Sequence, residues 1–205
     1  MKQFGLALHN YHDKFGCFPP AYVADATGRP MHSWRVLILP FMEEDALYQQ
    51  YRFDEPWDGP NNSKLANRIP EVYRCPTYER SHDRLKLSAP HLALMTNYVA
   101  VVGVGTAFDG SASVGVRDIE DGTSNTVLVI EARQHSVHWM QPDDISVNEL
   151  IAEVAQSASE THTNHVGGKH FLFGDGTVRF VDSQTNRSII RALCTIAGGE
   201  TVSDF

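Results

Sequence analysis

The sequence contains no long uninterrupted apolar run. A transmembrane helix needs about 20 consecutive apolar residues, and no stretch of this chain reaches that length. No secretory signal-peptide pattern opens the chain either. Its 17 Lys and Arg residues are outnumbered by 25 Asp and Glu residues, which gives a formal net charge of −8. This balance argues against nucleic acid and against an anionic membrane surface as partners, since both attract clustered basic residues.

Several catalytic motifs are also missing. There is no Gly-x-Ser-x-Gly, no Cys-x-x-Cys and no His-Glu-x-x-His, so nucleophilic hydrolysis, a thioredoxin-like site and a zinc protease have no motif to support them. The pairs His135/His138 and His162/His165, with His170 beyond, offer imidazole ligands for a transition metal. A metal-dependent hydrolase therefore rests on the number of histidines alone, and solvated or core histidines explain them more simply.

Three cysteines cannot all pair. An exported protein tolerates one bridge and one buried thiol. Cys17 with Cys75 is then the favoured pair, because Cys194 lies on the apolar side of an expected helix. The alternative is that all three are free thiols, of the kind often buried in protein cores.

The most informative segment that is present runs from His165 to Val181. It predicts two strands, at residues 169–174 and 177–182, joined by an Asp-Gly turn, a strong short-range signal for a hairpin. Taking Asp175-Gly176 as a two-residue loop places four apolar side chains on one face of the ribbon: Phe171, Phe173, Val178 and Phe180. We expect the three phenylalanines to be buried.

Other segments complete an α+β pattern. Residues 2–15 predict a helix with an apolar face, formed by Phe4, Leu8, Tyr11 and Phe15. Residues 96–102 and 126–132 are β-branched, largely apolar runs that predict buried strands. A capping box at Ser146 opens a further helix, and residues 188–197 predict the last one. Helices and strands are interspersed without regular βαβ alternation, which favours a single domain over residues 1–205 with its N-terminal helix on an antiparallel sheet and additional short helices.

The spacing His165-x9-Asp175-Gly176 resembles the signature of a large bacterial family of pilin-like proteins of unassigned function. Its members are described as type II secretion pseudopilin-like or prepilin-type processing-associated, and older labels call them family 10 extracellular solute-binding. Further fragments that carry the resemblance follow in order: residues 2–13, Phe18-Pro-Pro20, His32-Ser-Trp-Arg-Val36, Leu47-Tyr48, Glu55-Pro-Trp-Asp58, Tyr73-Arg-Cys-Pro76, Thr96-Asn-Tyr98, Asp121-Gly-Thr-Ser-Asn125 and Ala197-Gly-Gly-Glu200.

The resemblance implies a pilin-like fold and a non-enzymatic role in the cell envelope, periplasmic or extracellular. It also implies a longer N-terminal helix whose first half anchors the protein in the inner membrane. The chain opens at Met1-Lys2 without an N-cap residue. The simplest account is a soluble form with its anchor removed and Met1 added, and a natural variant without an anchor is the alternative. The implied partners are other pilin-like subunits or envelope proteins.

Three sets of residues are candidates for specific roles. His165 and Asp175 lie too far apart along a regular hairpin for a catalytic dyad, so the His-x9-Asp-Gly motif, with Gly176, is interpreted as structural. Asp118, Glu120 and Asp121 supply hard oxygen ligands suited to calcium, although the same residue types also build tight turns. No other cofactor is expected.

Tryptophans suggest an alternative function. Trp57, beside Asp58 in a polar loop, either stacks on a sugar or partner surface or closes the edge of the core. With Trp34 and Trp139, it supports the alternative of an extracellular solute- or glycan-binding module. The leading hypothesis is the non-enzymatic pilin-like envelope protein.

Overall fold

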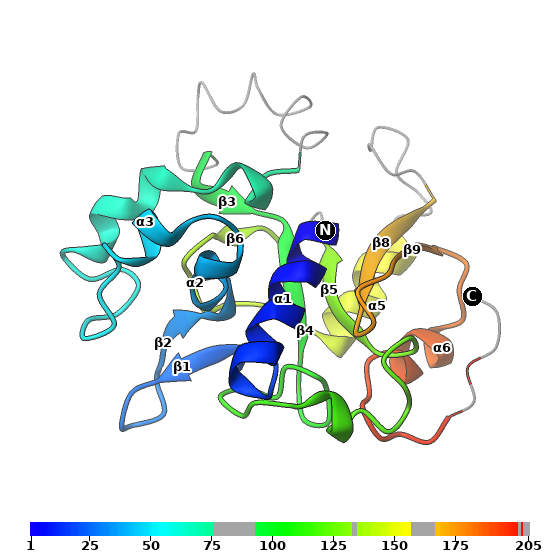
Figure 1. The fold of residues 1–205 in the computed structure, drawn as a ribbon. Coiled ribbons are helices and arrows are strands. Elements are labelled where there is room, and N and C mark those ends of the chain that lie inside the picture. Colours follow the sequence, from blue (N-terminus) through cyan, green and yellow to red (C-terminus); the bar gives the residue numbers. More distant parts are fainter. Residues whose placement is uncertain (76–92, 133–134, 157–166, 201, 203–205) are drawn as a thin grey trace.

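A five-stranded sheet forms the centre of the computed structural model, which describes residues 1–75, 93–132, 135–156, 167–200 and 202 (Figure 1). Its strands follow the order β7 (Ile145–Ser146), β4 (Tyr98–Val102), β5 (Val127–Glu131), β8 (Gly168–Phe173) and β9 (Val178–Asp182). Neighbouring strands are antiparallel except β4 and β7, which are parallel. The α+β class is confirmed. The sheet is antiparallel, as expected, except at this edge.

Helix α1 (Lys2–Phe15) covers one face of the sheet (Figure 1). It ends where the sequence predicts, because Gly16 adopts the left-handed conformation, with φ 78°, that terminates many helices. Phe4 and Leu8 are fully buried, and each contributes about 1.5–3 kcal/mol of burial free energy. The expected apolar face is only partly buried, however. Tyr11 is half-buried and Phe15 is 53% exposed, because the last turn of α1 extends past the sheet.

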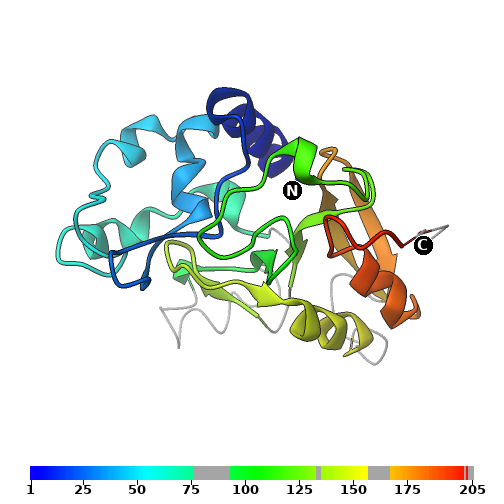
Figure 2. The ribbon, with the colours of Figure 1, turned by 90° about the horizontal axis from the view of Figure 1, so that it is seen from below.

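Two hydrophobic cores lie on opposite faces of the sheet. The first core lies under α1 and contains Phe4, Leu8, Trp34, Tyr73 and Trp139 among its buried side chains. The second core is covered by α5 (Val147–Gln156) and α6 (Arg187–Ala192), which Figure 2 shows on the side away from α1. Its buried side chains include Phe171, Phe173, Leu150, Val154, Ile190 and Leu193. Because β-strand side chains alternate between faces, the central strands contribute to both cores.

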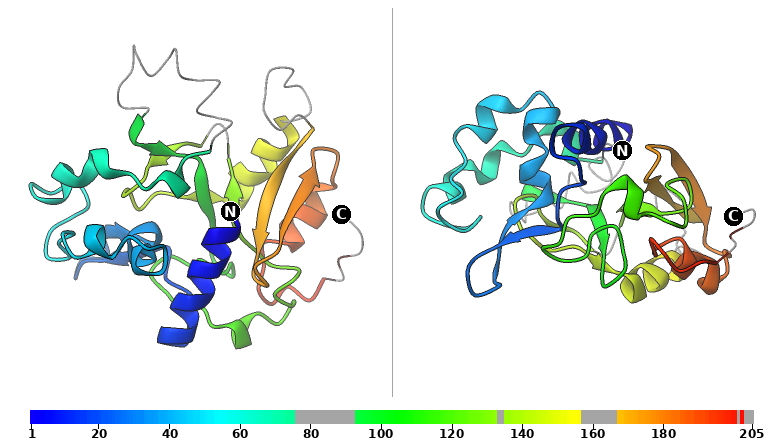
Figure 3. Two further views of the ribbon diagram at one scale, coloured as in Figure 1. Left: turned by 45° about the horizontal axis from the view of Figure 1, so that its top comes forward. Right: turned by 60° about the horizontal axis from the view of Figure 1, so that its bottom comes forward.

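Short elements gather beside the sheet on the side of β4, away from β8 and β9 (Figure 3). They are β1 (Tyr22–Ala24), β2 (Pro30–Ser33), α2 (Trp34–Leu37), η1 (Leu39–Phe41), α3 (Asp45–Tyr48), η2 (Asn62–Arg68), η3 (Glu71–Tyr73), β3 (Met95–Thr96) and β6 (Val137–His138). A last 3-10 turn, η5 (Val116–Asp118), precedes β5. The additional short helices expected from the sequence are therefore present.

The β8–β9 hairpin exists as predicted, but its register differs by one residue. Leu172 pairs with Val178 and His170 pairs with Phe180. The loop has three residues, because Phe173 N donates to Thr177 O and Gly176 N donates to Phe173 O. Gly176 takes the left-handed conformation, with φ 80°, that such a loop requires. As a consequence Phe180 faces away from Phe171 and Phe173 and is 44% exposed, so the expectation that it is buried is wrong.

The predicted capping box of α5 is confirmed. Glu149 N donates to Ser146 Oγ at 3.3 Å, and the Glu149 carboxylate accepts from Ser146 N at 2.8 Å. The last helix is shorter than expected and begins after Asn186, whose side chain accepts from Ser188 N. Among the residues described, no helix is both long enough and apolar enough to cross a membrane.

Candidate functional site

The Asp-Gly half of the family-like motif has a structural role at the tip of the hairpin. Asp175 Oδ1 accepts from Thr177 N at 2.9 Å and from Thr177 Oγ1 at 2.6 Å, which fixes the turn. The tip is also tied to the segment before β5, because Gly174 N donates to Thr126 O and Asp175 N donates to Thr123 O. His162 and His165 lie outside the described residues, so the structural role expected for His165 stays a prediction.

The three carboxylates proposed for calcium serve separate local bonds. Asp118 Oδ2 accepts from Gly115 N at 2.7 Å. Asp121 accepts from Gly198 N, Gly199 N and Thr195 Oγ1 at 2.7–3.0 Å, and thereby fixes the loop after α6. Within the described ranges no three His, Cys, Asp or Glu side chains converge as metal ligands. The alternative of turn chemistry accounts for the bonds of Asp118 and Asp121, and calcium at Asp118, Glu120 and Asp121 stays a prediction.

Two of the three tryptophans lie in the core and do not form a binding surface. Trp34 and Trp139 are fully buried, and their indole N–H groups donate to Asp144 Oδ1 at 3.1 Å and to Ala66 O at 2.9 Å. The proposal that Trp34 belongs to a ligand or partner surface is wrong, because its ring packs between Phe4 and Phe108. Trp57 is half-buried against the first core, with its ring 5.0 Å from that of His138, while Asp58 is exposed. That position agrees with closure of the core edge.

The cysteines form no bridge. All three are free thiols, with Cys75 and Cys194 buried and Cys17 half-buried, so the alternative of three free thiols is confirmed and the Cys17–Cys75 bridge is wrong. Burial raises the pKa of the Cys194 thiol to about 12, with Arg191 opposing the rise. Such a thiol stays protonated near neutral pH and is a poor nucleophile.

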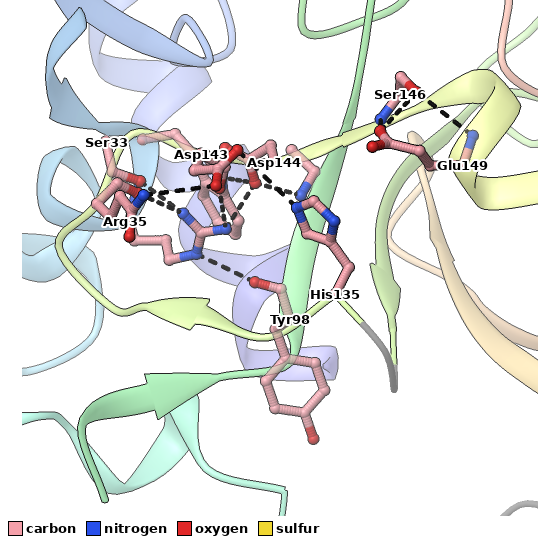
Figure 4. A network of polar contacts seen from close by, with 11 residues as sticks. Ser33, Arg35, Tyr98, His135, Asp143, Asp144, Ser146 and Glu149 are labelled. Carbon is pink, nitrogen blue, oxygen red and sulfur yellow. Dashed lines mark hydrogen bonds and ion pairs between the residues drawn. The ribbon is translucent and has the colours of Figure 1, made fainter. Parts of the chain in front are cut away.

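A buried ion pair that the sequence gives no sign of lies between α2 and β7. Arg35 Nη2 is 2.6 Å from Asp144 Oδ1, and the two side chains are 0% and 3% exposed (Figure 4). The guanidinium also donates to Ser33 Oγ and to main-chain oxygens of Tyr98, Gln141 and Asp143. Asp144 Oδ1 accepts in addition from Ala100 N at 2.7 Å. The network is saturated by its own chain, which indicates a role in the fold.

This network explains why the edge strand β7 lies parallel to β4. Asp144 immediately precedes β7, and its carboxylate binds the main chain of β4 at Ala100. Arg35 holds the same two segments through Tyr98 O and Asp143 O. Burial raises the pKa of Asp144, while Arg35, Trp34 and Ala100 N oppose that rise. The chain between β4 and β7 is itself a long connection that includes β5, and the charge pair fixes the start of β7 beside β4.

A second buried ion pair joins β8 to α5. Lys169 Nζ is 2.9 Å from Glu153 Oε1, and both side chains are nearly enclosed. Like the first pair, it links an element of the sheet to a segment that packs on it.

A comparison with protein families shows to which family the chain belongs. The model of the family described as "Protein of unknown function (DUF1559)", with the short name SBP_bac_10, matches residues 1–161. The chain belongs to this family. No curated protein and no solved structure matches the chain. The match confirms the family 10 solute-binding label expected from the resemblance, and the description of the family assigns no activity.

In the described part of this DUF1559 chain, several exposed or half-buried apolar side chains lie along α1 and η1. We call this group the α1–η1 surface, formed by Leu6, Tyr11, Phe15, Phe41, Met42 and Val72. Leu6 is 63% exposed, and beside it Phe41, Met42 and Val72 line a recess of about 160 Å³. Phe41 continues the surface to the end of the helix, with its ring 5.8 Å from Tyr11 and 6.4 Å from Phe15. The helical periodicity identified Phe15 but missed Leu6, which lies off the apolar face.

Proposed function

We propose that this protein is a non-enzymatic structural subunit of the cell envelope that assembles with further pilin-like subunits through α1. One observation carries the proposal: the α1–η1 surface leaves Leu6 63% and Phe15 53% exposed on a single helix. Leu6 and Phe15 are nine residues apart and so lie on opposite sides of α1, and Phe41 lies between them, lining the recess beside Leu6 and packing against the ring of Phe15. Exposed apolar side chains gathered in this way mark interaction sites. The partner for which this surface is best suited is an equivalent surface on a second copy of the chain, because identical subunits most often pair through one self-complementary patch.

Two further observations support a structural role. The family to which the chain belongs carries no assigned activity, and the sequence resembles pilin-like envelope proteins. Two buried ion pairs of the described chain link elements of the fold to one another. They are Arg35 with Asp144 and Lys169 with Glu153. A buried charge that is fully hydrogen-bonded within the protein contributes to the arrangement of the fold rather than to chemistry on a substrate.

Self-association of purified variants tests the proposal. Replacing Leu6 and Phe15 by Gln removes the apolar contacts. We expect self-association to weaken by about tenfold or more, because burying each apolar side chain in an interface contributes about 1–2 kcal/mol to the free energy of association. Sedimentation velocity over a range of concentrations measures the change. The double variant should keep its melting temperature, because exposed substitutions usually alter stability by less than about 0.5 kcal/mol.

A matched control is available on the same molecule. Val104 is 95% exposed on another segment, so Val104→Gln removes apolar surface without touching α1 and should leave self-association unchanged. A native chain that stays monomeric at all concentrations, or equal weakening by Val104→Gln, would contradict assembly through α1.

A solute-binding role is the second candidate. It is favoured by a basic, amide-lined groove on the short elements beside the sheet.

A further inference from the structure

A groove runs between the C-terminal end of α3 and the helical turn η2. It is an open groove of about 620 Å³, and its walls carry Arg52, Lys64 and Arg68. Three amide side chains lie between these cations, those of Gln49, Gln50 and Asn61, and Leu65 forms its apolar floor. The volume is within the range of about 300–1,000 Å³ that ligand sites occupy.

The charge of the groove is unusual for this chain. The protein carries a formal net charge of −8, yet three cations face one recess. Throughout the described ranges, none of the three has a carboxylate oxygen within ion-pair distance. The Glu55 carboxylate attracts Arg52 electrostatically from behind the groove, so the positive charges of Lys64 and Arg68 are the ones most available to a ligand. The guanidinium fork of Arg68 suits the paired oxygens of a carboxylate or a sulfate.

The groove is held in shape by hydrogen bonds behind it. Asn62 is fully buried; its side chain accepts from Arg52 N at 2.8 Å and donates to Arg52 O at 2.7 Å. Glu55 accepts from Asn61 N at 2.7 Å and from Asn61 Nδ2 at 3.0 Å, which orients the amide. The main chain that carries Arg52 and Asn61 is thus fixed, which lowers the entropic cost of binding.

The side chains of the groove are also partly oriented. Arg68 Nη1 donates to Gln50 Oε1 at 2.6 Å, and Lys64 Nζ lies 3.4 Å from Asn61 Oδ1. Each cation keeps further N–H donors for a ligand, because a guanidinium has five and an ammonium three. The amides supply both donors and acceptors, the complement that sugar hydroxyl groups need.

We propose that this groove binds an anionic saccharide, with Arg52, Lys64 and Arg68 on the acidic group and the amides on the hydroxyls. The charged group is a carboxylate, as in a uronic acid, or a sulfate ester. Three cations are too few for the long phosphate backbone of a nucleic acid, and the overall negative charge opposes it. The site lies on α3 and η2 and does not depend on assembly through α1.

Titration calorimetry with defined probes tests the proposal. The probes are a hexuronate disaccharide, a sulfated disaccharide, the neutral disaccharide cellobiose and inorganic sulfate. We expect one of the two acidic disaccharides to bind more tightly than cellobiose or sulfate, with an affinity that falls as salt is added, because charged contacts are screened. Binding of the hexuronate disaccharide would identify the acidic group as a carboxylate, and binding of the sulfated disaccharide would identify it as a sulfate ester.

Charge-matched variants assign the binding to the groove. Arg68→Gln and Lys64→Gln should each weaken binding by about tenfold, the usual effect of losing one charge-assisted contact. Arg29→Gln, at an exposed position on the β1–β2 connection, is the control and should bind as the native chain does. Because Lys64 is exposed and makes one long hydrogen bond, its variant stays interpretable if Arg68→Gln fails to fold.

Three results would overturn the proposal: no binding of either acidic disaccharide, equal binding of inorganic sulfate, or binding that the groove variants leave intact. None of these results bears on the proposed assembly through α1, because sedimentation of the Leu6 and Phe15 variants tests that proposal. Conversely, a monomeric chain that binds an acidic disaccharide would support the groove alone.

Discussion

Arg35 and Asp144 place opposite charges inside a region almost without solvent access. Removing two charges from water is costly, and their attraction offsets that cost only when further hydrogen bonds satisfy both groups. Here the guanidinium has four oxygen partners besides the carboxylate. The pair therefore fixes the arrangement of α2, β4 and β7 more than it raises the free energy of unfolding. Removing either partner leaves the other as an uncompensated buried charge.

A double-mutant cycle on this pair has a defined expected outcome. Asp144→Asn and Arg35→Met should each lower the free energy of unfolding by about 3–5 kcal/mol, because each leaves a buried charge without its partner. The double variant should lose less than the sum of the two. Urea denaturation measures all three. Arg29→Met, at an exposed site, is the control, and single-variant losses no larger than its own would show that the pair is not buried in solution.

Asp121 offers a test by pH. Partial burial raises the pKa of Asp121, but hydrogen bonds from Gly199 N, Gly198 N and Thr195 Oγ1 outweigh this, so the pKa lies below its ordinary value. The unfolded carboxyl therefore takes up its proton at higher pH than the folded one. The stabilisation is complete above the unfolded pKa of about 3.9 and is lost as pH falls through the folded pKa.

The comparison for Asp121 uses Asp121→Asn. We expect the native chain to melt at a higher temperature than this variant at pH 6, and the difference to shrink as the pH falls below about 4. Asp54→Asn, which removes an exposed carboxylate, controls for the general change in net charge. A difference between native chain and Asp121→Asn that persists unchanged to pH 2 would show that the carboxylate charge is not responsible.

At the scale of elements, the β8–β9 hairpin separates two phenylalanines that the sequence places together. Phe173 is fully buried in the second core, whereas Phe180 faces the other side of the ribbon and is 44% exposed. Phe173→Ala should cost about 3–5 kcal/mol, the usual range for a large buried aromatic side chain. Phe180→Ala should cost about 1 kcal/mol or less. Equal losses in thermal or urea denaturation would support the two-residue loop and its register instead.

The hairpin also shows how far sequence reasoning extends. The Asp-Gly pair correctly predicts the turn because it is a local signal. The register depends on whether Gly174 belongs to the strand or to the loop, and this is decided by bonds of the tip to Thr123 and Thr126. Likewise the capping box at Ser146 is local and predictable, while the contact of Arg35 with Asp144 joins residues 109 positions apart. No single sequence carries that information.

The candidate sites follow the same division. Local chemistry accounts for Asp118 and Asp121 as turn residues, but the same residue types also suit calcium, and only their arrangement separates the two. The cations of the groove lie on two segments: Arg52 follows α3, and Lys64 and Arg68 lie four residues apart on η2. Asn62 holds the main chain of Arg52 beside η2, and it is a buried residue at the end of a stretch whose composition is typical of a loop.

At the scale of the molecule, the two cores share one set of strands. In β4, Tyr98 and Ala100 enter the first core while Val99 and Val101 enter the second. In β8, Leu172 enters the first core and its neighbours Phe171 and Phe173 enter the second. A strand cannot leave one core without disrupting the other. The described part of the chain should therefore unfold as one cooperative unit, although its length exceeds that of most two-state domains.

The positions of the tryptophans make this cooperativity measurable. All three tryptophans pack in or against the first core, so intrinsic fluorescence reports on that core alone. Val154→Ala weakens only the second core, on α5, and should cost about 1–3 kcal/mol. If the sheet couples the cores, the variant lowers the urea midpoint of the fluorescence transition and that of the far-UV circular dichroism transition by the same concentration. A fluorescence midpoint that stays at the native value while the dichroism midpoint falls would show that the first core holds without the second, and that the shared strands do not bind the two into one unit.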